Sequence, residues 1–288
     1  AKKSGVSMVH VGEGADELFF GYQTYLRYKT INDHWWNPSQ KYIPQSMKSL
    51  IARGVASSMS GSSTRNEILY RWGKGQPLFL GGALSFGEAQ KKKMLGMVAN
   101  YQHDSVVAQI YPGLRQGYDS TAFIDYHLGV LKERDPHADF CQQMLYIELK
   151  QRLPELLLMR VDKMSMASGL EAREPFLDYK LIELMYNVPS SLKIKNGTTK
   201  YLLKRVAQGL LPDVTINRKK VGFAAPTVTW FKNGAYFSDY FDQVTKRLRA
   251  SHLPYARALA AVGKQCNHAT PLGAVQKWVI QNVGALLT

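Results

Sequence analysis

Cysteine is scarce in this chain of 288 residues, which contains only Cys141 and Cys266. Two cysteines without a Cys-x-x-Cys pair, and histidines that are not closely spaced, argue against a disulfide framework and against a structural zinc site. Both cysteines lie in segments with helical spacing, and neither is supported as a nucleophile. No apolar run approaches the roughly 18 residues that cross a bilayer, and the start, Ala1-Lys-Lys-Ser, lacks the apolar stretch of a signal peptide. We therefore expect a cytoplasmic protein without a membrane contact.

Acidic residues are also few, at 22 against 37 basic ones, which gives a net charge of +15. Such a charge occurs in nucleic-acid-binding proteins, and aromatic residues lie near positive charge at 35–36 and 70–72. The basic residues are nevertheless scattered, and the only triplets are 91–93 and 218–220. Because an enzyme that binds anionic substrates also benefits from positive potential, nucleic-acid binding is the alternative and not the main prediction.

Three carboxylates crowd a short stretch near the beginning of the chain. Residues 6–11 are predicted to form a strand and residues 15–29 a helix, so Glu13, Asp16 and Glu17 follow the carboxyl end of the strand. Open α/β sheets bind ligands at that edge. Carboxylates beside phosphate are typical of Mg²⁺, which takes one or two carboxylates together with phosphate oxygens. The helix dipole alone also favours acidic residues in a first turn, and the spacing leaves both interpretations open.

Two later segments carry basic residues among apolar ones. Residues 151–178 contain leucines and methionines at helical spacing, interrupted by Arg160 and other charges. We expect the methionines to fill the core: Met159, Met164 and Met166. Residues 197–223 place lysines at a predicted helix start and in a loop that ends at a glycine. Such lysines can bind phosphate as mobile point charges or can simply be solvated.

Taken together and in this order, three segments resemble the synthetase domain of glutamine-dependent asparagine synthetases. The matching pieces are Gly-Glu-Gly-Ala-Asp-Glu-Leu-Phe at 12–19, the stretch 160–178, and Arg-Lys-Lys-Val-Gly-Phe at 218–223. The resemblance is clear over 5–30 and 150–235. Three separated motifs in the correct order make a specific signal, which no one of them makes alone.

The resemblance implies that ATP activates a carboxylate as an acyl-adenylate, which ammonia then attacks. Asp16 matches the residue that holds Mg²⁺ on the ATP phosphates, so the implied cofactors are ATP and Mg²⁺. Glu13 matches the acid beside the acyl-adenylate, where a carboxylate can orient or deprotonate the incoming amine. Lys220 matches the family's catalytic lysine, which neutralises charge growing on the phosphates and on the oxyanion.

Other matched positions have binding or structural roles. Gly12 is expected to contact the nucleotide through its backbone, as glycine permits. Arg160 and Lys200 match basic positions that hold pyrophosphate or the substrate carboxylate. Asp178 follows a proline closely, so we expect it to cap the next helix at 179–187 rather than to bind a ligand.

The departures from the family pattern concern missing parts. The pyrophosphate-binding loop, Ser-Gly-Gly-x-Asp-Ser, and the glutaminase half with its N-terminal cysteine are not in these residues. We therefore expect 1–288 to be the C-terminal part of an asparagine synthetase-type domain, with an insertion-like helical region at 30–150. The expected partners are an N-terminal segment carrying that loop and a glutaminase domain or subunit that supplies ammonia.

The predicted fold class is α/β. The chain would be the helix-rich part of an adenine-nucleotide alpha hydrolase-like fold, the PP-loop synthetase fold, with a largely helical C-terminal portion. Only one strand is predicted, at 6–11, and its partner strands are expected in the missing part. Asparagine synthesis from the small-molecule carboxylate aspartate is the main prediction. A sugar or peptide carboxylate, amidated or cyclised, is the alternative within the family, and a homodimer is left open.

Overall fold

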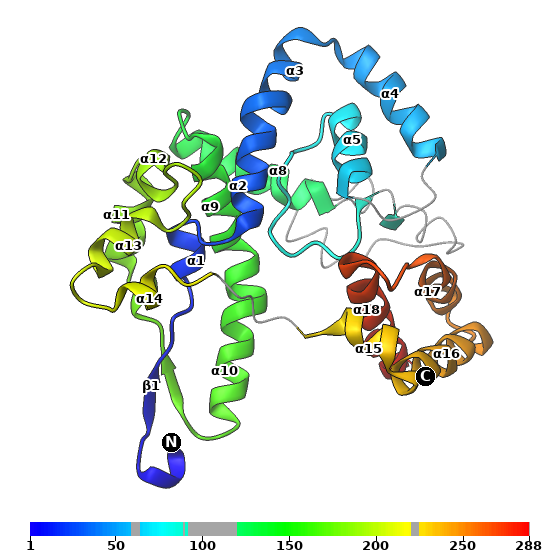
Figure 1. The fold of residues 1–288 in the computed structure, drawn as a ribbon. Helices are drawn as coiled ribbons and strands as arrows, with labels where there is room; N and C mark the ends of the chain where they lie inside the picture. The colour runs from blue at the N-terminus through cyan, green and yellow to red at the C-terminus, as the bar shows by residue number, and fades with distance from the viewer. Residues whose placement is uncertain (59–63, 89, 92–119, 220–224, 288) are drawn as a thin grey trace. The chain divides into compact units, whose positions relative to one another are not determined.

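A computed structural model describes residues 1–58, 64–88, 90–91, 120–219 and 225–287 (Figure 1). The chain divides into two compact units, which are described separately. Unit 1 comprises Ala1–Tyr42, Leu78–Ala83 and Ile124–Lys220; unit 2 comprises Ile43–Pro77, Leu84–Phe123 and Val221–Thr288. The described residues are mostly helical, as the helical spacing of the apolar residues predicted. The adenine-nucleotide alpha hydrolase-like fold and the insertion at 30–150 stay predictions.

Unit 1 consists of short helices and one small sheet. Its strands are β1 (Met8–His10) and β2 (Glu171–Arg173), and its longer helices are α2 (Gln23–Ile31), α8 (Ser120–Arg134), α9 (Phe140–Lys150), α10 (Met159–Met166), α11 (Tyr179–Asn187) and α13 (Tyr201–Ala207). The shorter helices are η1 (Lys2–Ser4), α1 (Ala15–Leu18), η2 (Asn32–Trp36), α3 (Asn37–Tyr42), η4 (Leu153–Leu158), η5 (Pro175–Leu177), α12 (Ser190–Lys193) and α14 (Asp213–Ile216). The predicted helix at 179–187 is confirmed with its cap, because the Asp178 carboxylate accepts a hydrogen bond from the Lys180 N–H at 2.9 Å.

The sheet corrects the expectation of a single strand. β1 pairs in parallel with β2, with Met8 opposite Glu171 and His10 opposite Arg173. Figure 1 shows β1, β2 and α10 side by side. β2 escaped prediction because its three residues, Glu-Ala-Arg, carry two charges and show no apolar alternation. A partner strand for β1 therefore lies within this chain.

The predicted continuous helix at 15–29 is wrong, because it breaks between α1 and α2. Phe20 adopts a left-handed backbone with φ of 56°. The Gly21 N–H donates to the Asp16 carbonyl at 2.7 Å, which closes the end of α1 after one turn. The break turns the chain directly after the acidic cluster, so it sets where those acids point.

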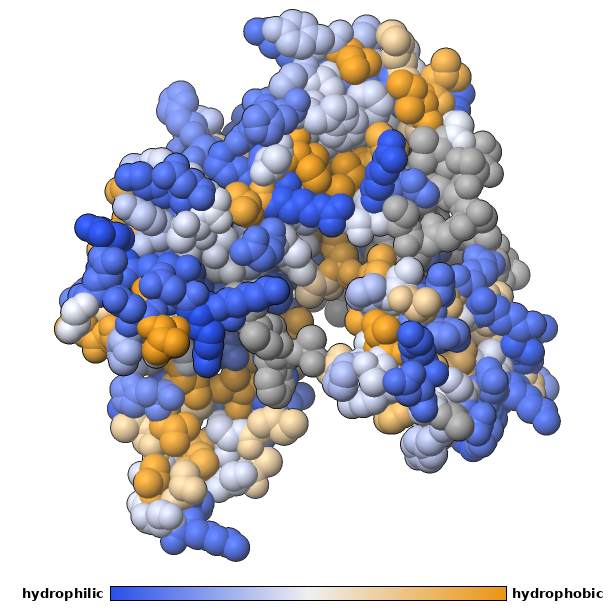
Figure 2. All heavy atoms as spheres, in the orientation of Figure 1, coloured by the Kyte–Doolittle hydropathy of each residue, from blue (hydrophilic) through white to orange (hydrophobic). Residues whose placement is uncertain are grey.

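The prediction that the methionines of α10 fill the core is also wrong. Met159, Met164 and Met166 expose 45%, 72% and 56% of their surface. Figure 2 shows hydrophobic side chains at the surface around β1 and α10. Helical periodicity identifies an apolar face of a helix, but it does not identify what covers that face.

The core of unit 1 is rich in aromatic rings. Tyr28 packs edge-on against Phe79 with ring centroids 5.2 Å apart, and Tyr25 packs against both Phe79 and Phe20. α9 adds the buried side chains of Met144, Leu145 and Ile147 to the core. Because α2 and α9 both contribute to this core, α9 is held rigidly, and it packs against both α1 and α2.

Unit 2 is a helical unit. It contains α4 (Gln45–Ser58), α5 (Thr64–Lys74), α15 (Thr227–Asn233), α16 (Ala235–Ala250), α17 (Pro254–Gln265) and α18 (Pro271–Leu287). The last four helices share a core that includes Phe231, Phe241, Val244, Leu248 and Ile280. The predicted helices near 236–249 and 271–283 are confirmed.

α5 carries a buried charge. The Arg71 guanidinium is fully buried, lies 3.3 Å from the Glu67 carboxylate and donates to the Pro77 carbonyl at 3.2 Å. A buried ion pair is stable only when its polar groups are also hydrogen-bonded. The hydrogen bond to Pro77 ties the segment after α5 to the helix. Across the part of the chain that the structure describes, none of the helices is both long and apolar enough to traverse a bilayer.

One buried cation in unit 1 yields a stability prediction. Lys193 is buried with its ammonium over the Phe20 ring, at 5.5 Å from the centroid, and burial lowers its pKa from 10.5 to about 8. The unfolded chain holds this proton up to its ordinary pKa, so it binds more protons than the folded chain between about pH 8 and 10.5. This residue therefore makes stability rise with pH across that window.

Lys193→Met is expected to raise the free energy of unfolding at pH 7 by about 2 kcal/mol, because it removes a poorly solvated charge. The gain over the wild type should shrink as the pH rises from 8 to 10. Urea unfolding at pH 7 and pH 10 measures both quantities. A variant that is no more stable at pH 7, or whose gain is independent of pH, would contradict the assignment.

Candidate active site

The acidic cluster follows β1 in a turn that only glycine can make. Gly14 is the N-cap of α1 with φ of 87°, and a Cβ there would overlap the Leu177 side chain. The left-handed turn starts α1 within a few residues of the end of β1. As predicted, Glu13 and Asp16 thus lie beyond the carboxyl end of a parallel strand.

Asp16 contacts Lys200, which comes from the segment 197–223. The Lys200 Nζ lies 2.7 Å from Asp16 Oδ1, and the two side chains expose 22% and 16% of their surface. Lys200 has a left-handed backbone with φ of 54°, and its N–H donates to the Phe19 carbonyl at 3.2 Å. Both backbone and side chain therefore join the start of α13 to the end of α1.

Gly21 leaves the room for this ion pair. A Cβ on Gly21 would overlap both Asp16 Oδ1 and Lys200 Cε. Sequence reasoning treated this glycine as part of a helix and missed its role. The left-handed Phe20 beside it is a second departure from ordinary backbone geometry, and such departures gather at functional sites.

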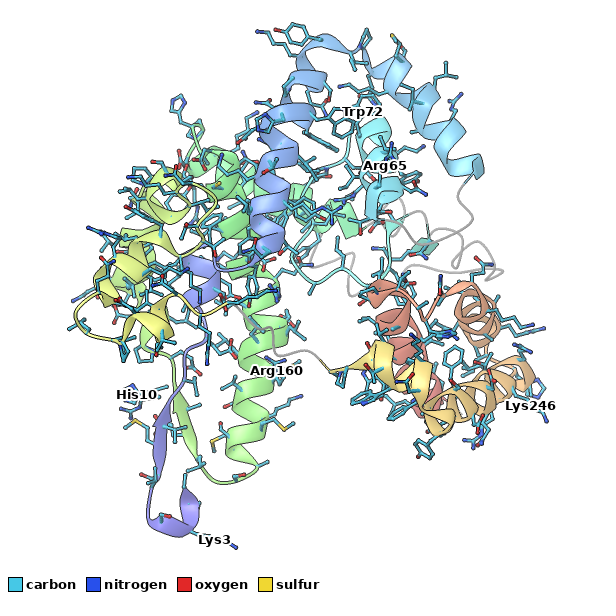
Figure 3. The ribbon with its side chains drawn as sticks, in the orientation of Figure 1. Lys3, His10, Arg65, Trp72, Arg160 and Lys246 are labelled. Atoms are coloured by element: carbon cyan, nitrogen blue, oxygen red, sulfur yellow. The ribbon has the colours of Figure 1, made fainter. Side chains whose placement is uncertain are left out.

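Glu13 meets Arg160, which comes from the second motif region. The Arg160 Nη2 lies 3.8 Å from Glu13 Oε1, and Figure 3 shows Arg160 near the start of α10. Both side chains are partly exposed, and a pair this long and wet contributes little to stability. Glu13 is therefore held loosely enough to exchange this cation for a ligand.

The third acid of the cluster faces the interior. Glu17 exposes only 1% of its surface and accepts a hydrogen bond from the Tyr22 hydroxyl at 2.9 Å. Burial raises the pKa of Glu17 above its ordinary value. Neighbouring acids on one turn thus have different environments: Asp16 faces a cation at the surface, and Glu17 is enclosed.

Two sequence-predicted residues have no such placement. Lys220 lies outside the described residues, whereas the preceding Arg218 and Lys219 are exposed. Gly12 has open space where a Cβ would be, so the backbone there can be approached, but its geometry does not require glycine. The positions that require glycine are Gly14 and Gly21.

The donor set fits a metal that arrives with phosphate. Among the described residues, no group of three or more His, Cys, Asp or Glu side chains is arranged to hold a metal ion. Asp16 supplies one carboxylate beside a cation, and Mg²⁺ in nucleotide sites commonly takes one or two carboxylates and completes its shell with phosphate and water. The residues therefore fit a phosphate-bound Mg²⁺ and not a metal cage made by protein alone.

Comparisons with known proteins agree with this arrangement of motifs. The family model described as asparagine synthase matches residues 1–288. The chain belongs to the asparagine synthase family. Its relatives include asparagine synthetase [glutamine-hydrolyzing] 1 of Bacillus subtilis, which is 32% identical over 80% of this chain and 32% of the relative. A putative asparagine synthetase [glutamine-hydrolyzing] of Mycobacterium tuberculosis is 31% identical over 80% of this chain and 31% of the relative.

A further protein to which the chain is similar has a different name. Amidase chyE of Penicillium rubens is 25% identical over 78% of this chain and 33% of the relative. The chain spans about a third of the length of these curated relatives. No solved structure matches the chain at a significant level.

Membership of the asparagine synthase family gives the Gly21 contact a functional consequence to test. Gly21→Ala should push Asp16 and Lys200 apart and lower nucleotide-dependent activity at least about tenfold, because the added carbon occupies the space of the ion pair. Gly129→Ala is the matched control, since Gly129 lies in α8 with open space around its Cβ position. The control should be neutral or slightly more stable.

ATP–pyrophosphate exchange and thermal unfolding, measured on both alanine variants, check this prediction. Normal exchange by Gly21→Ala would mean that the close approach at Gly21 has no functional importance.

Proposed function

We propose that the complete protein forms an amide from a carboxylate and ammonia at the expense of ATP, and that the carboxylate is aspartate. One observation supports this most: the segments 12–19, 151–178 and 197–223 each contribute side chains to two ion pairs, Glu13 against Arg160 and Asp16 against Lys200. The acids follow a parallel strand and the cations come from two other helices. This arrangement suits a ligand that carries both a metal-bound phosphate and a carboxylate.

The proposed reaction has two steps. The substrate carboxylate attacks the α-phosphorus of ATP, so an acyl–oxygen–phosphorus bond forms and pyrophosphate leaves. Ammonia then attacks the acyl carbon, AMP leaves, and the nitrogen gives up a proton as the amide forms. The chain must therefore balance phosphate charge in the first step and receive a proton in the second.

Five of the six predicted residues have a side-chain role in this proposal. Asp16 would hold Mg²⁺, which would neutralise charge on the ATP phosphates. Lys200, released from Asp16, would bind the departing pyrophosphate, and Arg160 would bind pyrophosphate or the substrate carboxylate. Glu13 would orient the amine and accept its proton. Lys220 would neutralise the phosphates and the oxyanion of the second step.

The ammonia source is proposed to be a glutaminase domain or subunit, because curated relatives carry glutamine-hydrolyzing in their names. The N-terminal segment with the pyrophosphate-binding loop is proposed as the other partner of this site. We further propose that the protein acts in the cytoplasm.

A second candidate within the family acts on another carboxylate. The relative named amidase chyE supports it, since its name differs from those of the asparagine synthetases. β-Lactam synthetases resemble the same pattern of motifs but typically have tyrosine where this chain has Glu13. The carboxylate of this chain therefore favours an external amine. Nucleic-acid binding remains the alternative of another class, supported by the net charge of +15 and by aromatic residues near positive charge.

Asp16→Asn tests the proposed reaction. The substitution keeps the shape of the side chain but removes the charge, so Mg²⁺-dependent ATP–pyrophosphate exchange in the complete protein should fall to background. Asp33→Asn is the matched control, since Asp33 pairs with Lys29 on an exposed helix surface and should exchange normally. Exchange that persists in Asp16→Asn would exclude the metal role of this carboxylate.

A further inference from the structure

α1 cannot hold the acidic cluster in place by itself. It contains four residues, Ala15–Leu18, which form a single turn. Isolated helices of one turn are unstable in water, because nucleation costs more than one hydrogen bond returns. The orientation of Asp16 therefore depends on tertiary contacts of α1 with the rest of unit 1.

A continuous polar chain runs from α1 to α9. The Tyr22 hydroxyl donates to Glu17 at 2.9 Å, and the Arg152 guanidinium lies over the Tyr22 ring, 4.2 Å from its centroid. The Arg152 Nη1 in turn donates to Glu148 at 3.2 Å. The chain begins one residue from Asp16 and ends on a long, packed helix.

Glu148 is a fixed anchor for this chain. Its carboxylate is buried, with 1% of the residue exposed, and it accepts hydrogen bonds from the Tyr25 hydroxyl and the Gly82 N–H, both at 2.6 Å. With Arg152 as its third partner, the carboxylate is bonded to three parts of unit 1. A buried carboxylate with three partners has little freedom to move.

The two phenols keep donating throughout the ordinary pH range. Burial, together with the charge of Glu17, raises the pKa of Tyr22 far above its usual value. Burial and the charge of Glu148 do the same to the pKa of Tyr25. Each hydroxyl therefore retains its proton and its hydrogen bond while the site works.

We propose that Tyr22, held by Arg152 and Glu148, is a positioning residue that orients α1 so that Asp16 can bind metal-bound phosphate. This inference rests on the proposed function and deepens it. The Tyr22 ring fixes the segment after α1 by stacking on Arg152, and the Tyr22 hydroxyl fixes α1 through its hydrogen bond to Glu17. Residues that orient a metal ligand in this way typically change metal affinity or activity when they are altered.

Tyr22→Phe tests the proposal in the complete protein, because it deletes the hydroxyl and keeps the ring on Arg152. The Mg²⁺ concentration that half-saturates ATP–pyrophosphate exchange should rise about 10-fold to 100-fold. Mn²⁺ binding in the presence of an ATP analogue with a methylene between the α and β phosphates, measured by electron paramagnetic resonance, should weaken by the same factor. Tyr28→Phe is the matched control, since Tyr28 is a buried core ring against Phe79 and should change neither quantity.

A double variant separates positioning from simple stability. Tyr22→Phe leaves the buried Glu17 carboxylate without this donor, which also lowers thermal stability. Tyr22→Phe with Glu17→Leu removes both polar partners and should recover the thermal midpoint, but not the Mn²⁺ affinity, because the hydrogen bond that ties α1 to the Tyr22 ring is still missing. Recovery of both would show that Tyr22 acts only through stability and would overturn the proposal.

The outcome for the wild type distinguishes the two hypotheses. Exchange by the wild type that is lost in Asp16→Asn supports the proposed function, and Tyr22→Phe then tests the positioning role alone. Exchange and Mn²⁺ affinity of Tyr22→Phe within twofold of the wild type would overturn the positioning role and leave the function intact. A wild type without exchange would contradict the function, and the Mn²⁺ titration would still report whether Tyr22 orients Asp16.

Discussion

The ion pair between Asp16 and Lys200 is the contact on which the site depends. It joins the turn after β1 to the start of α13, which are far apart in the sequence, and it is only partly exposed. Lys200 itself and Phe20, which follows α1, have left-handed backbones, and Gly21 leaves room for the two paired side chains. An arrangement that requires two uncommon backbone conformations persists only when the surrounding structure enforces it. The pair is therefore part of a preorganised site and not an incidental surface contact.

Burial divides the work of the acidic cluster. Glu13 faces a loosely held arginine, Asp16 faces a lysine at short range, and Glu17 is enclosed against Tyr22. Three carboxylates within five positions would otherwise repel one another and raise the cost of a metal-free state. Each carboxylate instead has its own partner. Glu13 and Asp16 are balanced by cations that an anionic ligand can attract.

The sequence allowed the chemistry of the site to be predicted better than its geometry. The acidic cluster and the cap at Asp178 follow from residue types and spacing, which local rules describe, whereas the resemblance to the family implied the cations Arg160 and Lys200. The helix break at Gly21 could not be predicted in this way, because the glycine leaves room for the side chain of Lys200, almost two hundred positions away. The strand at 171–173 is too short and too charged to predict, and the exposed methionines of α10 have the periodicity of a buried face. The contact between Tyr22 and Arg152 is likewise invisible in the sequence, since no local pattern links them.

The most direct measurement is a structure of the complete protein with Mg²⁺ and an ATP analogue that has a methylene between its α and β phosphates. We expect that the Asp16 carboxylate binds the metal, that the Lys200 ammonium leaves Asp16 for a phosphate oxygen, and that α1 stays fixed against α9 through Tyr22. A nucleotide bound elsewhere, with the ion pair of Asp16 and Lys200 intact, would contradict it.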